Sequence, residues 1–313
     1  MALQPTIFPI DRPVMPEARQ IGRRSAIDGL EIGIKSMTHQ WIIGPRRIGK
    51  TSVAKAVLTR LRQAGHVALD IDLSKRDFGT QKNLAGEIAR QAQAAQAGIP
   101  IASRRFWRFA SRQTPRARRL GKALDGFGFA DQGEALEAVS SVLAGADDGA
   151  PGLAGVLEAL SVHGRATGKH VVVLLDEVHR LAGLEQSDRE VATWCRDGDC
   201  PIVFVFAGSE ESAIRELREE GQPLASVGRE FQLNDIGTED WLRGLRLRFH
   251  EAGVQVDDSG LFAIVEASDG HPRRTMLIAS YVHTKAEAQP DHHATSAVVE
   301  LAIRDAQEDR AWA

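Results

Sequence analysis

The chain has 313 residues, of which 43% are hydrophobic and 26% are charged, and its formal net charge is −3 at pH 7. These values are typical of a globular protein whose core is large enough to be stable without disulfides or structural metals. The net charge indicates no general affinity for nucleic acid, although a global sum can conceal a local basic patch.

Cysteine content and hydropathy exclude several further classes. Cys195 and Cys200 stand alone, whereas a structural zinc site needs about four ligands and a disulfide framework needs more cysteines. The N-terminal residues carry charges and prolines where a signal peptide needs an apolar run. No apolar stretch approaches the ~18 residues that cross a bilayer. We therefore expect two reduced thiols in a soluble, cytoplasmic protein.

Apolar spacing divides the chain into elements, after a proline-containing segment at 1–20 that predicts an extended arm. In chain order the spacing predicts a helix at 25–36, a strand at 39–43, a helix at 50–64, a strand at 66–72, helices at 80–97, 132–144 and 152–166, and strands at 171–175, 201–206 and 230–233. After Asn234 the strand signals stop, and helices are predicted at 238–252, 257–268, 272–288 and 294–310. The alternating part predicts a parallel sheet with helices on both faces, and the helical tail predicts a lid subdomain.

A glycine-rich loop lies between the first predicted strand and the next helix. It reads Gly44-Pro45-Arg46-Arg47-Ile48-Gly49-Lys50-Thr51 and has the P-loop spacing G-x-x-x-x-G-K-[ST]. The two glycines allow backbone N–H groups to face phosphate oxygens, and the helix presents its positive end to the same anion. Lys50 is then expected to bind the β- and γ-phosphates and Thr51 to bind Mg²⁺, with Ser52 beside them.

Two carboxylates, Asp176 and Glu177, follow the apolar strand at 171–175. A P-loop site needs an acid to hold Mg²⁺ and a base to activate water, and we assign these roles to Asp176 and Glu177 respectively. The alternative is a core strand followed by a solvated turn. Because Glu177 suits water activation, the pair favours hydrolysis over phosphoryl transfer to a second substrate.

Ser209 follows the strand at 202–206, where its hydroxyl would lie near the γ-phosphate. The same residue also suits an N-cap of the segment that begins at Glu210, and both interpretations remain open.

With these motifs in their order, the chain resembles the AAA+ and archaeal-type P-loop ATPases, close to their STAND branch. Besides the P-loop and the Asp176-Glu177 strand end, three short elements carry the resemblance. They are Ile21-Gly22-Arg23-Arg24, similar to the F-x-G-R element at the adenine pocket, Phe206-Ala-Gly-Ser209, similar to the polar sensor, and Gly270-His-Pro272-Arg273-Arg274, similar to the G-x-P element of the lid.

The resemblance implies an α/β fold, a P-loop NTPase (ASCE/AAA+-like) three-layer sandwich with a parallel sheet, followed by a small helical lid subdomain. It also implies that the P-loop strand is central and next to the Asp-Glu strand. Nucleotide contacts would come from Gly22, Arg23, the loop itself, Pro272 and Arg273 or Arg274. Arg229 would act as an arginine finger on a neighbour's nucleotide, although a solvated arginine beside Glu230 is the alternative.

The expected domains are an arm at 1–20, a nucleotide-binding core at 21–235 with a basic helical insertion at about 100–150, and a lid with a C-terminal helix at 236–313. Only about 25 residues follow the lid elements, too few for the winged helix or repeat array of multidomain relatives. Roles that depend on such domains are therefore not expected.

Residues 101–124 contain no acid and many arginines with interleaved aromatic residues. The candidate contacts to nucleic acid are Arg104, Arg105, Arg108, Arg112, Arg116, Arg118 and Arg119. Such a stripe suits a phosphate backbone, an anionic membrane surface or an acidic partner, and it equally suits a solvated helix face.

These features together predict an ATPase that uses ATP and Mg²⁺ to drive conformational change or assembly. The expected partners are further copies of the chain, another protein or nucleic acid, in defence, replication or a mobile element. The alternative is an ATP-gated switch or scaffold that acts through a protein partner with little turnover.

Overall fold

The computed structural model describes residues 7–10, 13–14, 17–74, 78, 80–95, 153–184, 186–197 and 200–312. The chain forms two compact units, one from 1–29, 44–56 and 232–313, and the other from 30–43 and 57–231. The basic segment 101–124 and the predicted helix at 132–144 lie outside the described residues. Within the described ranges, no helix combines the length and apolar composition that crossing a bilayer requires.

The second unit is built on a five-stranded sheet with the order β2-β3-β4-β1-β5. The strands are β1 (Gln40–Ile43), β2 (Val67–Asp72), β3 (Val171–Asp176), β4 (Ile202–Ala207) and β5 (Arg229–Gln232). The pairs β2–β3, β3–β4 and β4–β1 are parallel. All residues of β3 and β4 are buried, as expected for strands covered on both faces.

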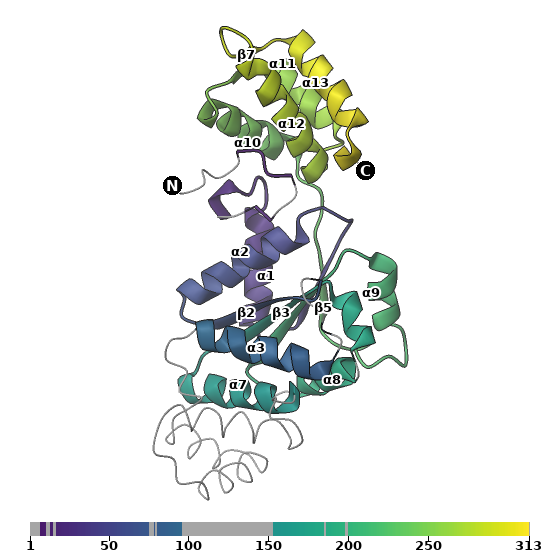
Figure 1. Ribbon diagram of the computed structural model, residues 1–313. Coiled ribbons are helices and arrows are strands. Elements are labelled where there is room, and N and C mark those ends of the chain that lie inside the picture. The colour runs from purple at the N-terminus through teal and green to yellow at the C-terminus, as the bar shows by residue number, and fades with distance from the viewer. Residues whose placement is uncertain are drawn as a thin grey trace, which may run out of the picture. The chain divides into compact units, whose positions relative to one another are not determined.

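Helices cover both faces of this sheet (Figure 1). On one face lie α3 (Gln81–Ala95), α7 (Leu153–Thr167) and α8 (Ser187–Arg196), and on the other lie the C-terminal parts of α1 (Arg24–Lys35) and α2 (Lys50–Gln63). The short helices η2 (Val178–Gly183) and α9 (Glu211–Leu217) follow β3 and β4. Apolar side chains at helical spacing, such as Ile34, Leu58 and Leu61, are buried and explain these positions.

Aromatic side chains fix the centre of this core. The rings of Trp41 and Phe206 stack with centroids 4.3 Å apart, and the Trp41 indole N–H donates to the Val227 carbonyl at 2.7 Å. The guanidinium of Arg218 lies over the Trp41 ring, 5.2 Å from its centroid. Strands β1 and β4 are therefore held by side chains as well as by the backbone ladder.

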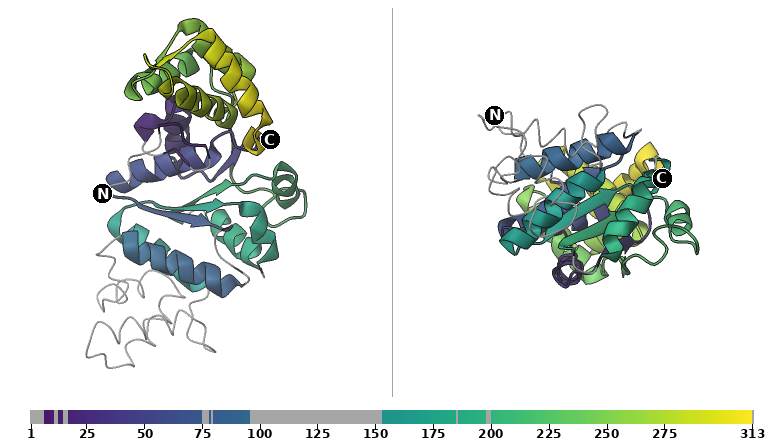
Figure 2. Two further views of the ribbon diagram at one scale, coloured as in Figure 1. Left: turned by 45° about the horizontal axis from the view of Figure 1, so that its top comes forward. Right: turned by 90° about the horizontal axis from the view of Figure 1, so that it is seen from below.

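The other unit contains the helical tail. It comprises η1 (Glu17–Arg19), α10 (Thr238–Glu251), α11 (Asp258–Ala267), α12 (Pro272–Glu287), α13 (Ser296–Glu308) and η3 (Arg310–Trp312). Figure 2 shows α12 and α13 side by side. Trp241, Leu245, Ile264 and Val282 are among the residues of its apolar core. Pro272 begins α12 at a position where the missing N–H costs nothing.

Most predicted elements are confirmed within one or two residues, but two expectations are wrong. The P-loop strand β1 is not next to β3, because the wholly apolar β4 lies between them and pairs with both. Strand structure also continues beyond Asn234, since Gln255–Val256 (β6) pairs in parallel with His293–Ala294 (β7). Helix α8 was not predicted at all.

Candidate functional site

The predicted phosphate loop connects β1 to the first turn of α2. Its backbone bends through positive φ angles at Gly44 (152°), Arg47 (65°) and Gly49 (106°). A Cβ at Gly44 would lie 2.8 Å from the Leu233 carbonyl oxygen, so only glycine fits there. Alternating backbone conformations of this kind turn successive N–H groups inward, and the loop therefore fits a bound phosphate.

Lys50 is buried, with 7% of its surface exposed. Its ammonium donates to the carbonyls of Gly44 at 2.6 Å and Pro45 at 2.8 Å. The charge thus lies against the loop itself rather than in solvent. Thr51 follows in the first turn of α2, partly exposed, at the positive end of the helix.

Arg23 makes hydrogen bonds that hold the phosphate loop. Its guanidinium donates to the Ile48 carbonyl at 2.6 Å and to the Asn234 carbonyl at 2.5 Å. Burial lowers the pKa of Arg23 to about 10, while Asp235 acts in the opposite direction. The guanidinium therefore connects the phosphate loop to the segment that leads from β5 into the lid.

The lid element contacts the same loop through His271. Its Nε2 lies 3.2 Å from the Arg46 carbonyl, and burial lowers the pKa of the ring. Gly22 has a φ of 61°, and a Cβ there would come within 2.5 Å of Ile236. The structure thus brings three predicted elements together, namely the Gly22-Arg23 turn, the loop and the residue before Pro272.

Ser52 is engaged by the N-terminal segment. Its hydroxyl accepts the Val14 N–H at 3.1 Å, and the Gln20 amide donates to the Ser52 carbonyl at 2.7 Å. Arg248 of α10 donates to the carbonyls of Ile7 and Arg19. The described part of the segment is therefore attached to the start of α2 and to the lid.

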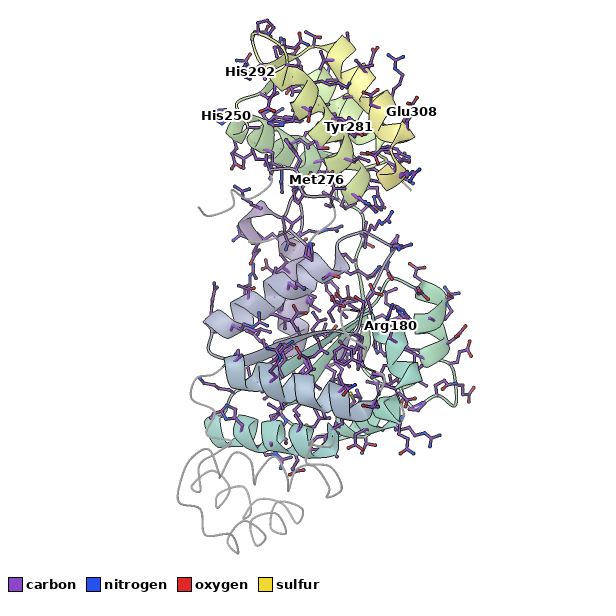
Figure 3. The ribbon with its side chains drawn as sticks, in the orientation of Figure 1. Arg180, His250, Met276, Tyr281, His292 and Glu308 are labelled. Carbon is purple, nitrogen blue, oxygen red and sulfur yellow. The ribbon has the colours of Figure 1, made fainter. Side chains whose placement is uncertain are left out.

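The two lid arginines lie near the C-terminal turn. Arg274 donates to the Trp312 carbonyl at 3.4 Å, and its guanidinium lies 5.2 Å from the Trp312 ring centroid. Arg273 contributes to the lowered pKa of Asp309, whose main causes are hydrogen bonds from the Ala311 N–H and the Tyr281 hydroxyl. Tyr281 is labelled on α12 in Figure 3.

The carboxylates lie at the end of β3 in the other unit. Asp176 is buried, with 4% exposed, and its Oδ1 accepts the Glu177 N–H at 3.1 Å. The Glu177 carboxylate accepts the Ser209 hydroxyl at 2.8 Å and the Ser209 N–H at 3.3 Å. The N-cap of α9 is Glu210, so the Ser209 hydroxyl serves Glu177 and not the helix.

Strand register places the ends of β1, β3 and β4 at one edge of the sheet. Trp41 and Leu175 are both partners of Phe206, one on each side of β4. Ile43, the last residue of β1, therefore lies at the same edge of the sheet as Asp176, which ends β3. Parallel sheets of this type bind ligands at the carboxyl edge of their strands.

Arg229 starts β5 at the opposite edge. Its N–H donates to the His39 carbonyl at 2.9 Å, just before β1, and its side chain is exposed. The neighbouring Glu230 pairs with Arg218. The described contacts leave the Arg229 side chain at a surface, and its role as an arginine finger stays a prediction.

Cys195 and Cys200 line a cavity of about 650 Å³ at that opposite edge, together with Arg229. Both thiols are free, and burial raises the pKa of each. Within the described residues, no group of His, Cys, Asp and Glu has the arrangement of a metal site.

Sequence analysis assigns no role to His179 or Glu210, although His179 ends the run Leu175-Asp-Glu-Val-His179 that resembles the acidic strand end of the AAA+ ATPases. The His179 ring lies beside Glu177, because η2 turns sharply after β3. The only signal was the spacing Asp176-Glu177-Val178-His179, which carries no expectation of contact until the turn is known.

Comparison with known proteins gives a consistent assignment. A family model described as "AAA domain" matches residues 36–215. The Walker-type ATPase PABY2304 of Pyrococcus abyssi superposes with a TM-score of 0.64 over 97% of this chain and 75% of that chain, at 16% identity.

Two Aeropyrum pernix proteins are also similar in structure. The ORC2 protein, solved with ADPNP and ADP, gives a TM-score of 0.60 over 96% of this chain and 71% of that chain, at 17% identity. The ORC1 protein in complex with DNA gives 0.52 over 96% and 68%, also at 17% identity. Such low identities show the fold alone. No curated protein sequence matches the chain. Since the family model spans more than half of its residues, this chain belongs to the AAA domain family and has the fold of the AAA+ P-loop ATPases.

Proposed function

We propose that the chain binds ATP with Mg²⁺ and hydrolyses it to ADP and phosphate. The observation that carries this proposal is the Glu177 carboxylate, which accepts the Ser209 hydroxyl and follows the buried Asp176 at the carboxyl end of β3. A phosphate-binding loop alone favours nucleotide binding. A second, oriented carboxylate beside the metal-binding one favours attack by water.

The reaction needs phosphate binding, metal binding and proton transfer, and we assign residues to each. The loop N–H groups and Lys50 bind the β- and γ-phosphates, and Thr51 and Asp176 hold the metal. Bound Mg²⁺ would neutralise charge on the phosphate oxygens. Glu177 takes a proton from water, whose oxygen forms a bond to the γ-phosphorus while the bond to the β–γ bridging oxygen breaks. We assign further nucleotide contacts to Gly22 and Arg23, and to Pro272 and Arg273 of the lid. Arg229 would act as an arginine finger on the nucleotide bound by a neighbouring copy of the chain.

The metal requirement tests the reaction directly. Phosphate release from ATP is expected in Mg²⁺ and is expected to stop in excess EDTA. Asp176→Asn should raise the Mg²⁺ concentration needed for half-maximal turnover, because a neutral amide binds the cation more weakly than a carboxylate. Asp291→Asn, the same change at an exposed lid residue, is the control. Equal turnover in EDTA would contradict the proposal.

We further propose that the ATP cycle drives assembly on nucleic acid in a soluble compartment such as the cytoplasm. Two observations support this, the arginine-rich segment 101–124 and the structural similarity to an ORC1 protein solved with DNA.

DNA affinity should fall steeply with salt concentration if this segment binds phosphates. Replacing five of its arginines, Arg104, Arg105, Arg108, Arg112 and Arg116, by glutamine should flatten the slope of log affinity against log salt by about 4.5. Fluorescence anisotropy measures the slope for the parent and for the variant, with a labelled duplex and with a labelled single strand. An absence of DNA binding at low salt would leave a protein partner or a solvated face.

A further inference from the structure

Glu177 has an unusual backbone conformation for a residue with a side chain. Its φ and ψ are 56° and 45°, in the left-handed region, and it is the N-cap of η2. Few non-glycine residues adopt this conformation, and those that do are concentrated at functional sites. The turn fixes the direction in which the carboxylate leaves the chain.

All described contacts of the Glu177 carboxylate use one of its two oxygens. Oε2 accepts the hydroxyl and the N–H of Ser209, and it lies 3.4 Å from Nδ1 of His179. Within the described part of the chain, no hydrogen bond or ion pair is made through Oε1. The contacts therefore hold the group by Oε2 and leave Oε1 as the oxygen that can accept a proton from water.

His179 occupies a fixed position between two carboxylates. Its Nε2 lies 3.6 Å from Oε1 of Glu210, and the side chain is only 15% exposed. Its Nδ1 is buried, lies 3.4 Å from Oε2 of Glu177 and has no hydrogen-bond partner within the described part of the chain. An imidazolium carries a proton on each ring nitrogen, so its Nδ1–H can point toward Glu177 while its Nε2–H points toward Glu210.

Apolar packing holds η2, the helix that carries His179, in place. Val178 and Leu181 of η2 are fully buried, and Ile214 of α9 is nearly so. A Cβ on Gly208 would lie 3.1 Å from Ile214 and 3.6 Å from Val178, so β4, η2 and α9 meet closely there. The turn is found in Figure 3 by the label of Arg180, the residue after His179.

We propose that His179 is a positioning residue for Glu177. The ring fixes Oε2 together with Ser209, so that Oε1 faces the attacking water. Glu210 in turn holds the ring from the other side. This inference rests on the proposed function, since it assigns a partner to the base that the hydrolysis needs.

The expected effect of His179→Ala is a loss of turnover without a loss of ATP binding. A general base contributes roughly 10²–10⁴-fold, and loss of its orientation should lower kcat by about 10- to 100-fold. KM for ATP should stay within about twofold, because the residue touches the base and not the nucleotide. Phosphate-release assays on the full chain measure both.

Two conservative variants separate a positioning role from a structural one. The amide N–H of His179→Asn can replace Nδ1–H, and this variant should recover most of kcat. The longer amide of His179→Gln reaches toward Glu210 instead, and it should stay as slow as His179→Ala. Equal recovery by both variants, or a fall in kcat matched by a rise in KM, would overturn the inference.

A double variant tests the coupling. In a Glu177→Gln background, His179→Ala should not slow the residual rate further, because its only effect passes through Glu177. A further tenfold loss would overturn the inference. If Glu177→Gln stalls turnover while His179→Ala has the parent's kcat, only this inference fails. If the parent releases no phosphate in Mg²⁺, the proposed function fails as well.

Discussion

Replacing Lys50 by alanine is expected to abolish ATP binding at micromolar concentrations. The ammonium is buried in the phosphate loop and donates to the carbonyls of Gly44 and Pro45, so it is already held where a phosphate would bind. Charge-assisted hydrogen bonds contribute about 1.5–3 kcal/mol each. Loss of two such bonds to phosphate weakens binding by roughly 10²- to 10⁴-fold. Calorimetric titration with a non-hydrolysable ATP analogue measures this loss.

Lys55→Ala is the matched control for this experiment. It removes the same charge from α2, beyond the first turn of that helix. The control should bind the analogue as the parent does, and both variants should keep the parent's circular dichroism spectrum. Tight binding by Lys50→Ala would remove the phosphate-loop assignment, and with it the role given to Thr51.

Local features of the site could be predicted from the sequence because each depends on a short run of residues. The glycines at 44 and 49 and the lysine at 50 specify a loop whose backbone angles only glycine tolerates at Gly44. The apolar run at 171–175 is short and rich in valine, which favours a buried strand, and β3 is buried at all its positions. Fold class and carboxylate position follow from these runs.

Features that depend on distant residues could not be predicted in this way. Arg23 donates to a carbonyl 211 residues away, and no local pattern indicates that pair. Alternation of strands and helices predicts a parallel sheet but does not specify that β4 lies between β1 and β3. Strands β6 and β7 have two residues each, too few to show any spacing.

The contacts of Glu177 could not be predicted from the sequence either. The approach of His179 depends on a left-handed residue followed by a 3₁₀ turn, and propensity alone disfavours a glutamate in that conformation. Tertiary packing of Val178 and Leu181 overrides the local preference. Sites at which local preference fails in this manner are often functional.

Glu177→Gln is expected to bind ATP with the parent's affinity but to lower turnover by about 10²- to 10⁴-fold, since an amide cannot accept the proton of the attacking water. The amide still accepts the Ser209 hydroxyl through its oxygen, so the local structure is kept. The variant should therefore accumulate in the ATP-bound state. Single-turnover phosphate release and light scattering with ATP measure the stall and any assembly that accompanies it.

Glu211→Gln provides the matched control, because it makes the same change at an exposed position of α9. Its turnover should equal that of the parent. If Glu177→Gln hydrolyses ATP at the parent's rate, Glu177 is not the base. If the variant stalls but assembles no differently from the parent, the proposed hydrolysis stands and the proposed coupling of the ATP cycle to assembly fails. Only a stall together with a trapped assembly supports a motor-like cycle over a nucleotide-gated switch with incidental turnover.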